Sequence, residues 1–203
     1  MAPENALICG ADEAGRGPLA GRVYAAAVIL PENAADIPGL AGLNDSKKLS
    51  EKKRDELAAV IKSVAKAYCI AYAEVEEIER VNILHAALGC MDRAIKGLSV
   101  KADYALIDGN KTDGIETPCR CVIGGDAKCP SIAAASILAK TERDRYCKEV
   151  LDVRYPEYGF AVHKGYGTKA HYAAVDTYGL CEEHRPSFFK KYFEQKQREH
   201  EGK

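Results

Sequence analysis

Four acidic residues follow short apolar runs of the sequence, and carboxylates are side chains that can hold divalent cations. Asp12 and Glu13 follow residues 6–11, Asp108 follows residues 104–107, and Asp126 lies just after residues 120–123. If these runs are strands of one sheet with the same ends together, the four carboxylates converge at one edge. Like charges at close range raise one another's pKa, so this convergence becomes favourable when cations balance the charge. Oxygen ligands without His or Cys favour Mg²⁺ or Mn²⁺ over zinc.

A glycine-rich turn, Gly15-Arg16-Gly17-Pro18, follows the first two acids directly. Glycines let a ligand approach the main chain closely, and the arginine can meet a phosphate or stand exposed. Ordinary turn chemistry also explains such a segment, just as a strand that ends at the protein surface explains any one of the acids. The position of the turn beside two carboxylates is what makes it a candidate binding loop.

The carboxylates need a sheet to position them, and the sequence pattern predicts one. Apolar runs bounded by Gly, Pro and acids predict strands at 6–11, 22–30, 68–75, 104–107 and 120–123. Periodicity and capping residues predict helices from Ser50 to about Lys66, from Asn82 to Leu98, from about Pro130 to near Tyr155, over 169–178, and over a last segment with Phe188, Phe189, Tyr192 and Phe193. Residues 159–168 are predicted to form a loop. Early strands and late helices indicate an α/β fold with a mixed sheet and helices on its faces.

The composition sets limits on the class of protein. The 203 residues include 47% hydrophobic and 29% charged side chains, and the net charge is −1. These values are typical of a soluble globular domain and exclude disorder and fibrous repeats. No apolar run reaches the roughly 18–20 residues that span a bilayer, and the N-terminus lacks the pattern of a secretory signal. We therefore expect a cytoplasmic protein with eight reduced cysteines.

Seven motifs are spread along nearly the whole chain, from about Ile8 to Phe188. In chain order they are Asp-Glu-x-Gly-Arg-Gly-Pro at 12–18, Gly-Leu-Asn-Asp-Ser-Lys-Lys-Leu at 42–49, Ile-Asp-Gly-Asn at 107–110, Gly-Asp-Ala-Lys at 125–128, residues 131–140 with Arg143-Asp144, His-Lys-Gly-Tyr-Gly-Thr at 163–168, and His-Arg-x-Ser-Phe at 184–188. Together they resemble, in the same order, the motifs of type 2 ribonuclease H (bacterial ribonuclease HII). One departure is Pro186, where members of that family commonly carry a second basic residue.

This resemblance implies a fold and a set of site residues. The fold is of the ribonuclease H type, a central five-stranded mixed sheet flanked by helices, here as one catalytic domain over 1–203 with a helical C-terminal subregion at about 157–203. The family's catalytic, metal-binding carboxylates match Asp12, Glu13, Asp108 and Asp126. Its loop that contacts the ribose 2′-hydroxyl and the neighbouring phosphate matches Gly15, Arg16 and Gly17, and its junction-sensing tyrosine matches Tyr166. Candidate contacts to flanking phosphates are Lys47, Lys48, Lys164 and Arg185.

The implied activity is hydrolysis of the RNA strand in RNA–DNA hybrids with Mn²⁺ or Mg²⁺, by two-metal-ion catalysis. The enzyme would cut on the 5′ side of a ribonucleotide at an RNA–DNA junction, including single ribonucleotides embedded in duplex DNA. This reaction removes misincorporated ribonucleotides and RNA primers. We expect a monomer that binds hybrids and ribonucleotide-containing duplex DNA but no membrane, and residues 192–203 contain no convincing motif for a replication clamp.

Two alternatives remain at this stage. The related type 3 enzyme carries an additional N-terminal domain, for which the eleven residues before Asp12 leave no room. A catalytically silent hybrid-binding module is expected to have lost at least one carboxylate, whereas all four are present. Turnover with Mg²⁺ or Mn²⁺ distinguishes the enzyme from the silent module.

Overall fold

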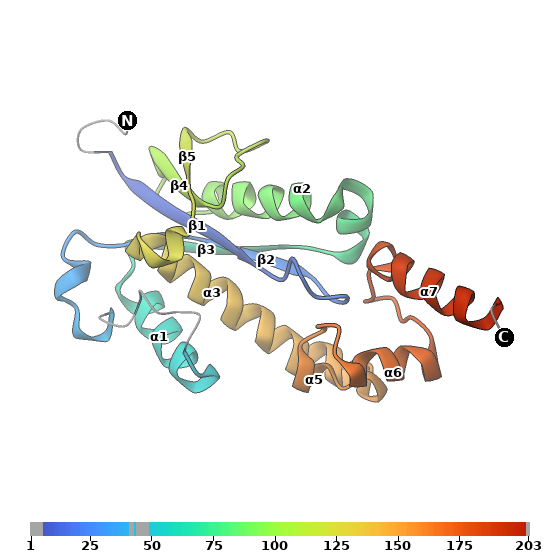
Figure 1. Ribbon diagram of the computed structural model, residues 1–203. Coiled ribbons are helices and arrows are strands. Elements are labelled where there is room, and N and C mark those ends of the chain that lie inside the picture. Colours follow the sequence, from blue (N-terminus) through green and yellow to red (C-terminus); the bar gives the residue numbers. More distant parts are fainter. Residues whose placement is uncertain (1–5, 41–42, 44–48, 202–203) are drawn as a thin grey trace.

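The computed structural model describes residues 6–40, 43 and 49–201. Within these residues a five-stranded sheet has the order β3-β2-β1-β4-β5 (Figure 1). The strands are β1 (Ile8–Ala14), β2 (Val23–Ile29), β3 (Ala67–Ala73), β4 (Tyr104–Asp108) and β5 (Cys119–Val122). β1 runs antiparallel to β2 and β2 antiparallel to β3, whereas β1, β4 and β5 are mutually parallel. The predicted five-stranded mixed sheet is therefore confirmed.

Helices cover both faces of this sheet. Figure 1 shows α2 on one face and α1 with α3 on the other, while α5, α6 and α7 lie toward the far end of α3. The helices are α1 (Glu51–Val64), α2 (Val75–Lys96), α3 (Pro130–Tyr146), α4 (Asp152–Arg154), α5 (Phe160–His163), α6 (Lys169–Tyr178) and α7 (Pro186–Glu201). A π-helical segment, Cys147–Leu151, joins α3 to α4, so that the chain stays helical from Pro130 to Arg154.

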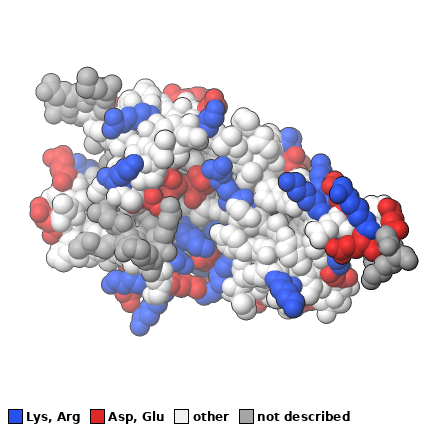
Figure 2. Space-filling view, in the orientation of Figure 1, with Lys and Arg blue, Asp and Glu red and all other residues white. Residues whose placement is uncertain are grey.

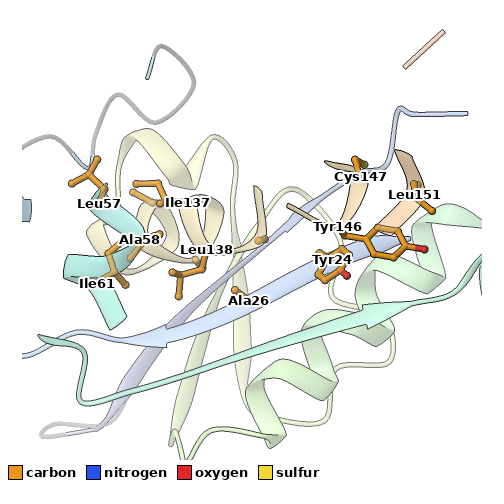
Figure 3. Close-up of a cluster of buried hydrophobic side chains, with 14 of the residues drawn as sticks. Tyr24, Ala26, Leu57, Ala58, Ile61, Ile137, Leu138, Tyr146, Cys147 and Leu151 are labelled. Carbon is orange, nitrogen blue, oxygen red and sulfur yellow. The ribbon is translucent and has the colours of Figure 1, made fainter. Parts of the chain in front are cut away.

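The sheet separates two hydrophobic cores because successive side chains of a strand point to opposite faces. One core lies between the sheet and α2, and the other between the sheet and α1, α3 and the C-terminal helices. Figure 3 shows part of the second core, where Leu57 and Ile61 of α1 lie close to Ile137 and Leu138 of α3. β2 is buried along its whole length since both of its faces are covered.

Helix α3 lies unusually close to β1, which fixes the position of the candidate site. A Cβ atom on Gly10 would lie 2.3 Å from the backbone nitrogen of Ile132, so only glycine fits at this position. Three successive alanines, residues 133–135, are fully buried in the same helix. This close contact places the N-terminal half of α3 directly over the strand that carries Asp12.

The predicted helices agree closely with the structure. The hydroxyl of Ser50 caps α1 by accepting a hydrogen bond from the Lys53 backbone at 3.3 Å, as its position predicts. α6 has the predicted bounds and ends at Gly179, whose φ of +78° suits glycine. In α7, Phe189 is fully buried and anchors the helix to the rest of the protein.

Three boundaries differ from the prediction. β1 continues through both acids to Ala14, because pairing with β2 extends to Tyr24. α2 begins at Val75 rather than at Asn82, where the helix bends and φ is +69°. The Asn82 side chain caps the second half of that helix, which is why the sequence shows a helix start there. Part of the predicted 159–168 loop is the short helix α5.

The eight cysteines carry free thiols. Among the described helices, none combines the length and the apolar character needed to cross a bilayer.

Candidate active site

The parallel pairing of β1 with β4 brings acidic residues together at one edge of the sheet. Ala11 pairs with Ile107, so the next residues along the two strands, Asp12 and Asp108, are neighbours at their ends. The Asp12 side chain faces α3, where Ser136 contacts it, as expected from its alternation with Ala11, which belongs to the core under α2. We call Asp12, Glu13, Asp108 and Asp126 the carboxylate edge. Figure 2 shows acidic side chains gathered near the middle of this view, with Lys and Arg side chains beside them.

Asp12 is the most strongly perturbed member of this edge. It is only 5% exposed. Burial, followed by the charges of Glu13 and Asp108, raises its pKa well above the usual range, although a hydrogen bond from Ser136 opposes the shift. A buried carboxylate between two like charges is unfavourable unless a cation joins it. Asp12 therefore has the environment of a metal ligand.

Glu13 points to the other side of the same edge. Its pKa is raised mainly by burial and also by Asp108, while Arg16 lowers it. The Arg16 guanidinium lies 3.4 Å from the Glu13 carboxylate, in a contact that is half exposed on the arginine side. Glu13, Arg16 and Asp108 line one small hollow against α2. The edge is therefore reachable from outside the protein.

Asp126 lies next to this group through its neighbour Gly125. The backbone N–H of Gly125 donates to Asp108 at 2.6 Å, and Asp126 follows in the short turn Gly125–Ala127 with 5% exposure. In the described parts of the chain, no group of three or more His, Cys, Asp or Glu side chains is gathered closely enough to hold a metal ion. Asp12, Glu13 and Asp108 are thus close neighbours, Asp126 adjoins them through Gly125, and the four do not form a finished coordination cage.

The glycine-rich turn and Tyr166 lie side by side, although 149 positions separate Gly17 from Tyr166 in the sequence. A Cβ atom on Gly17 would lie 3.7 Å from the Tyr166 ring, which is 44% exposed. Gly15 is buried and Gly17 is exposed, so the turn passes from the protein interior to the surface beside the ring. We call residues 15–21 and residues 163–168 the reading loops.

Two of the predicted phosphate contacts, Arg185 and Lys164, make hydrogen bonds within the protein. Arg185 is fully buried, and its guanidinium donates to backbone carbonyls of the 15–21 loop, so it faces the protein rather than a ligand. The ammonium of Lys164 is bonded to the Ala161 carbonyl at the end of α5. Lys47 and Lys48 lie outside the described residues, so their predicted contacts remain predictions.

Three histidines hold the 163–168 loop in place through hydrogen bonds and ring stacking. The backbone N–H of Cys181 donates to Nδ1 of His184 at 2.9 Å, which leaves Nε2–H of His184 to donate to Nε2 of His171 at 3.0 Å. Nδ1–H of His171 then donates to the Tyr166 carbonyl at 3.0 Å. His163 stacks on His171 with ring centroids 4.4 Å apart. Burial lowers the pKa of both His171 and His184 to about 4, so the chain of hydrogen bonds is formed by neutral rings.

A basic wall lies beside the carboxylate edge, and sequence reasoning gave it no role. Asp144, 4% exposed, pairs with Lys140 at 2.6 Å and with Arg54 at 2.7 Å. The two cations line a cavity of about 300 Å³ together with Glu13, Gly15, Ser136 and Tyr166. The spacing of Ser136, Lys140 and Asp144 is four residues, which places them on one face of α3 and is the signal that could have identified them. A larger cavity, about 490 Å³, is lined by Lys96 and Glu116, which pair with each other at 2.9 Å, and it contains none of the site residues.

Comparison with known proteins gives a consistent result. The sequence profile of the family described as Ribonuclease HII matches residues 9–196. Ribonuclease HII of Dechloromonas aromatica (strain RCB) is 56% identical over 183 residues, which cover 90% of this chain and 90% of that protein. The PCNA:RNase HII complex from Archaeoglobus fulgidus contains a chain with a TM-score of 0.74 and 25% identity, matched over 88% of this chain and 93% of that one. Bst-RNase HIII in complex with Mn²⁺ shares the fold, with a TM-score of 0.58 and 20% identity over 85% of this chain and 62% of that one.

Proposed function

Because this chain belongs to the ribonuclease HII family, and is therefore a ribonuclease H that cleaves RNA–DNA hybrids, we propose that it cuts on the 5′ side of a ribonucleotide at an RNA–DNA junction. The substrates include single ribonucleotides embedded in duplex DNA, and the products carry 3′-hydroxyl and 5′-phosphate ends. The observation that carries this proposal is the contact between Gly17 and Tyr166 beside the carboxylate edge. In this arrangement the glycine-rich turn can contact the 2′-hydroxyl of the ribonucleotide while Tyr166 stacks on the next sugar.

Enzymes of the ribonuclease H family depend on divalent metal ions, and we propose that Asp12, Glu13, Asp108 and Asp126 hold Mg²⁺ or Mn²⁺ here. The donor set fits such ions because it consists of carboxylate oxygens, and because Asp12 is buried among like charges that a cation would balance. When bound, a pair of such ions activates water and stabilises the leaving 3′ oxygen of the phosphodiester. Ser136 and the Gly125 N–H orient the Asp12 and Asp108 carboxylates, respectively.

The reading loops recognise the sugars on the two sides of the cut. Backbone groups of Gly15, Arg16 and Gly17 contact the ribose 2′-hydroxyl and the neighbouring phosphate, since this hydroxyl is the group that distinguishes RNA from DNA. Tyr166 stacks on the adjoining deoxynucleotide, for which its ring is exposed. Lys140 and Arg54 give the adjacent cavity a positive wall that attracts the phosphate backbone, so binding weakens with salt.

We propose further that the chain acts as a monomer and as a single catalytic domain, with residues 157–203 as its helical subregion. It would work in the cytoplasm to remove misincorporated ribonucleotides and RNA primers from DNA. The structural relative from Archaeoglobus fulgidus forms a complex with PCNA. That partner is known for the archaeal relative, and we propose a monomer for this chain.

The decisive experiment uses a DNA duplex that contains one ribonucleotide, incubated with Mg²⁺ or Mn²⁺, with the cut position mapped on a sequencing gel. We expect a single cut on the 5′ side of the ribonucleotide and no cleavage of the all-DNA duplex. A cut at any other position would contradict the junction specificity. Tight binding without a cut under either metal would instead indicate a silent hybrid-binding module.

A further inference from the structure

Two arginines are buried directly beneath the reading loops. Arg143 of α3 is 1% exposed and Arg185, just before α7, is 0% exposed. Arginine is almost never fully buried unless it is paired with an acid. In the described parts of the chain, however, no carboxylate lies within ion-pair distance of either guanidinium. We call Arg143 and Arg185 the arginine pair, and their position calls for an explanation other than a salt bridge.

Arg185 holds the 15–21 loop by its main chain. Its three guanidinium nitrogens donate to carbonyl groups of Gly21 at 2.7 and 3.0 Å, Gly15 at 2.8 Å, Pro18 at 2.8 Å and Arg16 at 3.3 Å. The backbone around it adds to this grip, since Arg185 N–H donates to the Leu19 carbonyl at 2.8 Å and Gly21 N–H to the Glu183 carbonyl at 2.7 Å. The loop that carries Gly15, Arg16 and Gly17 is therefore fixed along its length.

Arg143 connects this loop to the other one. Its Nη2 donates to the Lys164 carbonyl at 2.8 Å and to the Ala20 carbonyl at 3.4 Å, so one nitrogen contacts both reading loops. A backbone hydrogen bond from Leu19 N–H to the Gly165 carbonyl, 2.8 Å, joins the loops at the same point. The guanidinium carbon also lies 5.7 Å from the centre of the Tyr166 ring. The two loops thus share one buried support.

The two remaining nitrogens of Arg143, Nε and Nη1, have no hydrogen-bond partner among the residues that the structure describes. A buried donor without an acceptor costs about 1–3 kcal/mol, and more when it is charged. Arg143 and Arg185 also repel each other, which contributes to the lowering of the Arg185 pKa to about 9, a shift caused mainly by burial. This cost indicates that Arg143 is kept for the hydrogen bonds that its Nη2 donates to both reading loops.

We propose that the arginine pair consists of positioning residues that hold the two reading loops in register, so that the 2′-hydroxyl contact and the Tyr166 stack fall on adjacent nucleotides at the same time. This inference rests on the proposed function. Cleavage at a single embedded ribonucleotide needs the 2′-hydroxyl contact and the Tyr166 stack at the same time, at a fixed distance from each other. A continuous hybrid offers a 2′-hydroxyl at every position and no deoxynucleotide sugar for Tyr166 at the cut. Loss of register therefore damages the first substrate more than the second.

The test compares kcat/KM on a single-ribonucleotide duplex with kcat/KM on a continuous RNA–DNA hybrid. Arg143→Lys replaces the guanidinium, whose Nη2 contacts both loops, by a shorter ammonium and keeps the charge, and we expect the ratio to fall roughly 10- to 100-fold. Gly165→Ala disturbs the same junction from the opposite loop, because its Cβ would lie 2.8 Å from the Ala20 carbonyl oxygen. It should lower the ratio in the same way, and it carries the test if Arg143→Lys does not fold.

A double-mutant cycle separates an effect on the relative position of the two reading loops from an effect on the stability of the whole protein. In the Tyr166→Ala background, Arg143→Lys should lower the ratio no further, since there is no ring left to position. Arg93→Lys is the matched control, because Arg93 also donates to a carbonyl, that of Tyr72 at 2.9 Å, on the face of the sheet covered by α2. It should lower Tm without changing the ratio.

The outcomes distinguish the two proposals. If the wild-type enzyme prefers the single-ribonucleotide duplex and both variants retain that preference, the register role is overturned and the proposed function stands. An additive effect of Arg143→Lys in the Tyr166→Ala background also overturns it. A wild-type enzyme with no preference for the junction overturns the proposed specificity, and the register role with it.

Discussion

Asp12 at the carboxylate edge and Arg185 beneath the reading loops are both buried charges, yet their surroundings differ. Around Asp12 the nearest charges have the same sign and raise its pKa, so the protein itself leaves the charge unbalanced. Around Arg185 four carbonyl groups accept hydrogen bonds from the guanidinium. The carboxylate edge therefore has a charge that the proposed cation would balance, whereas the 15–21 loop is held by the protein's own hydrogen bonds. The comparison indicates that the chemistry is supplied on binding, while recognition is preorganised.

Removal of one charge from the carboxylate edge is the strongest test of this contrast. Asp12→Asn or Asp108→Asn should lower kcat/KM by about 10³-fold or more with either metal, because each change removes a charge that we propose binds metal and that is worth several kcal/mol in the transition state. Without metal, Asp12→Asn should leave Tm unchanged or raise it, because the repulsion at this buried position disappears. Activity assays and thermal denaturation measure the two effects.

Asp103→Asn is the matched control for these variants. Asp103 is an exposed residue just before the start of β4, at the opposite end of the strand from Asp108, and it accepts a hydrogen bond from the Leu7 backbone at 2.9 Å. Its replacement should leave cleavage unchanged. Full activity in both Asp12→Asn and Asp108→Asn would refute the proposed site.

Addition of metal should complete the carboxylate edge and stabilise the fold. At a metal concentration of 100 times Kd, binding to the native state alone contributes about 2.7 kcal/mol. For a chain of this length, that corresponds to a rise in Tm of about 5–10 °C. The rise should be lost in Asp12→Asn/Asp108→Asn. An equal rise in that double variant would place the bound ion elsewhere.

Acid should weaken the reading loops through their histidines. Burial lowers the pKa of His171 and His184 to about 4, below the ordinary 6.5, so between pH 6.5 and 4 it is the unfolded chain that binds protons. Stability is therefore present above pH 6.5 and is lost as pH falls through this window. At pH 5 the loss should be on the order of 2 kcal/mol for one such histidine.

Thermal denaturation as a function of pH measures this effect. His171→Gln should reduce the slope of Tm against pH between 6.5 and 4. His85→Gln is the control, since His85 is exposed on α2 and contacts only Asn82 in the described structure. A slope that is the same in His171→Gln as in the wild type would show that the histidine chain does not determine acid stability.

The position of Asp12 beside Asp108 could be predicted from the sequence, whereas the surroundings of Arg185 could not, for a physical reason. Strand ends follow from local apolar patterns, and parallel pairing of β1 with β4 then brings Asp12 beside Asp108. The burial of an arginine depends on loops distant in sequence, so nothing local to Arg185 shows that it donates to residues 15–21. A basic residue between a histidine and an aromatic segment has the same local pattern whether it faces solvent or carbonyl groups.

Asn82 and Lys140 show two further limits. The Asn82 cap is a local signal and marks the second half of α2, whereas the first half, from Val75, was not recognised from the sequence. Lys140 was part of a motif, and its spacing from Asp144 placed both on one face of α3. The sequence could not show that Arg54 of α1 completes the cluster, because that contact joins residues 90 positions apart.

The smallest expected effect concerns recognition alone. Tyr166→Ala removes a ring that is 44% exposed and is not part of either core, so Tm should change little. Stacking of one base on an aromatic ring is worth about 1–3 kcal/mol, and a contact of this size predicts a loss of roughly tenfold or more in cleavage at single embedded ribonucleotides. Tyr166→Phe keeps the ring and should keep the preference for junctions. Since the carboxylate edge is untouched in both variants, cleavage of continuous hybrids should persist. An unchanged junction preference in Tyr166→Ala would show that Tyr166 does not recognise the junction.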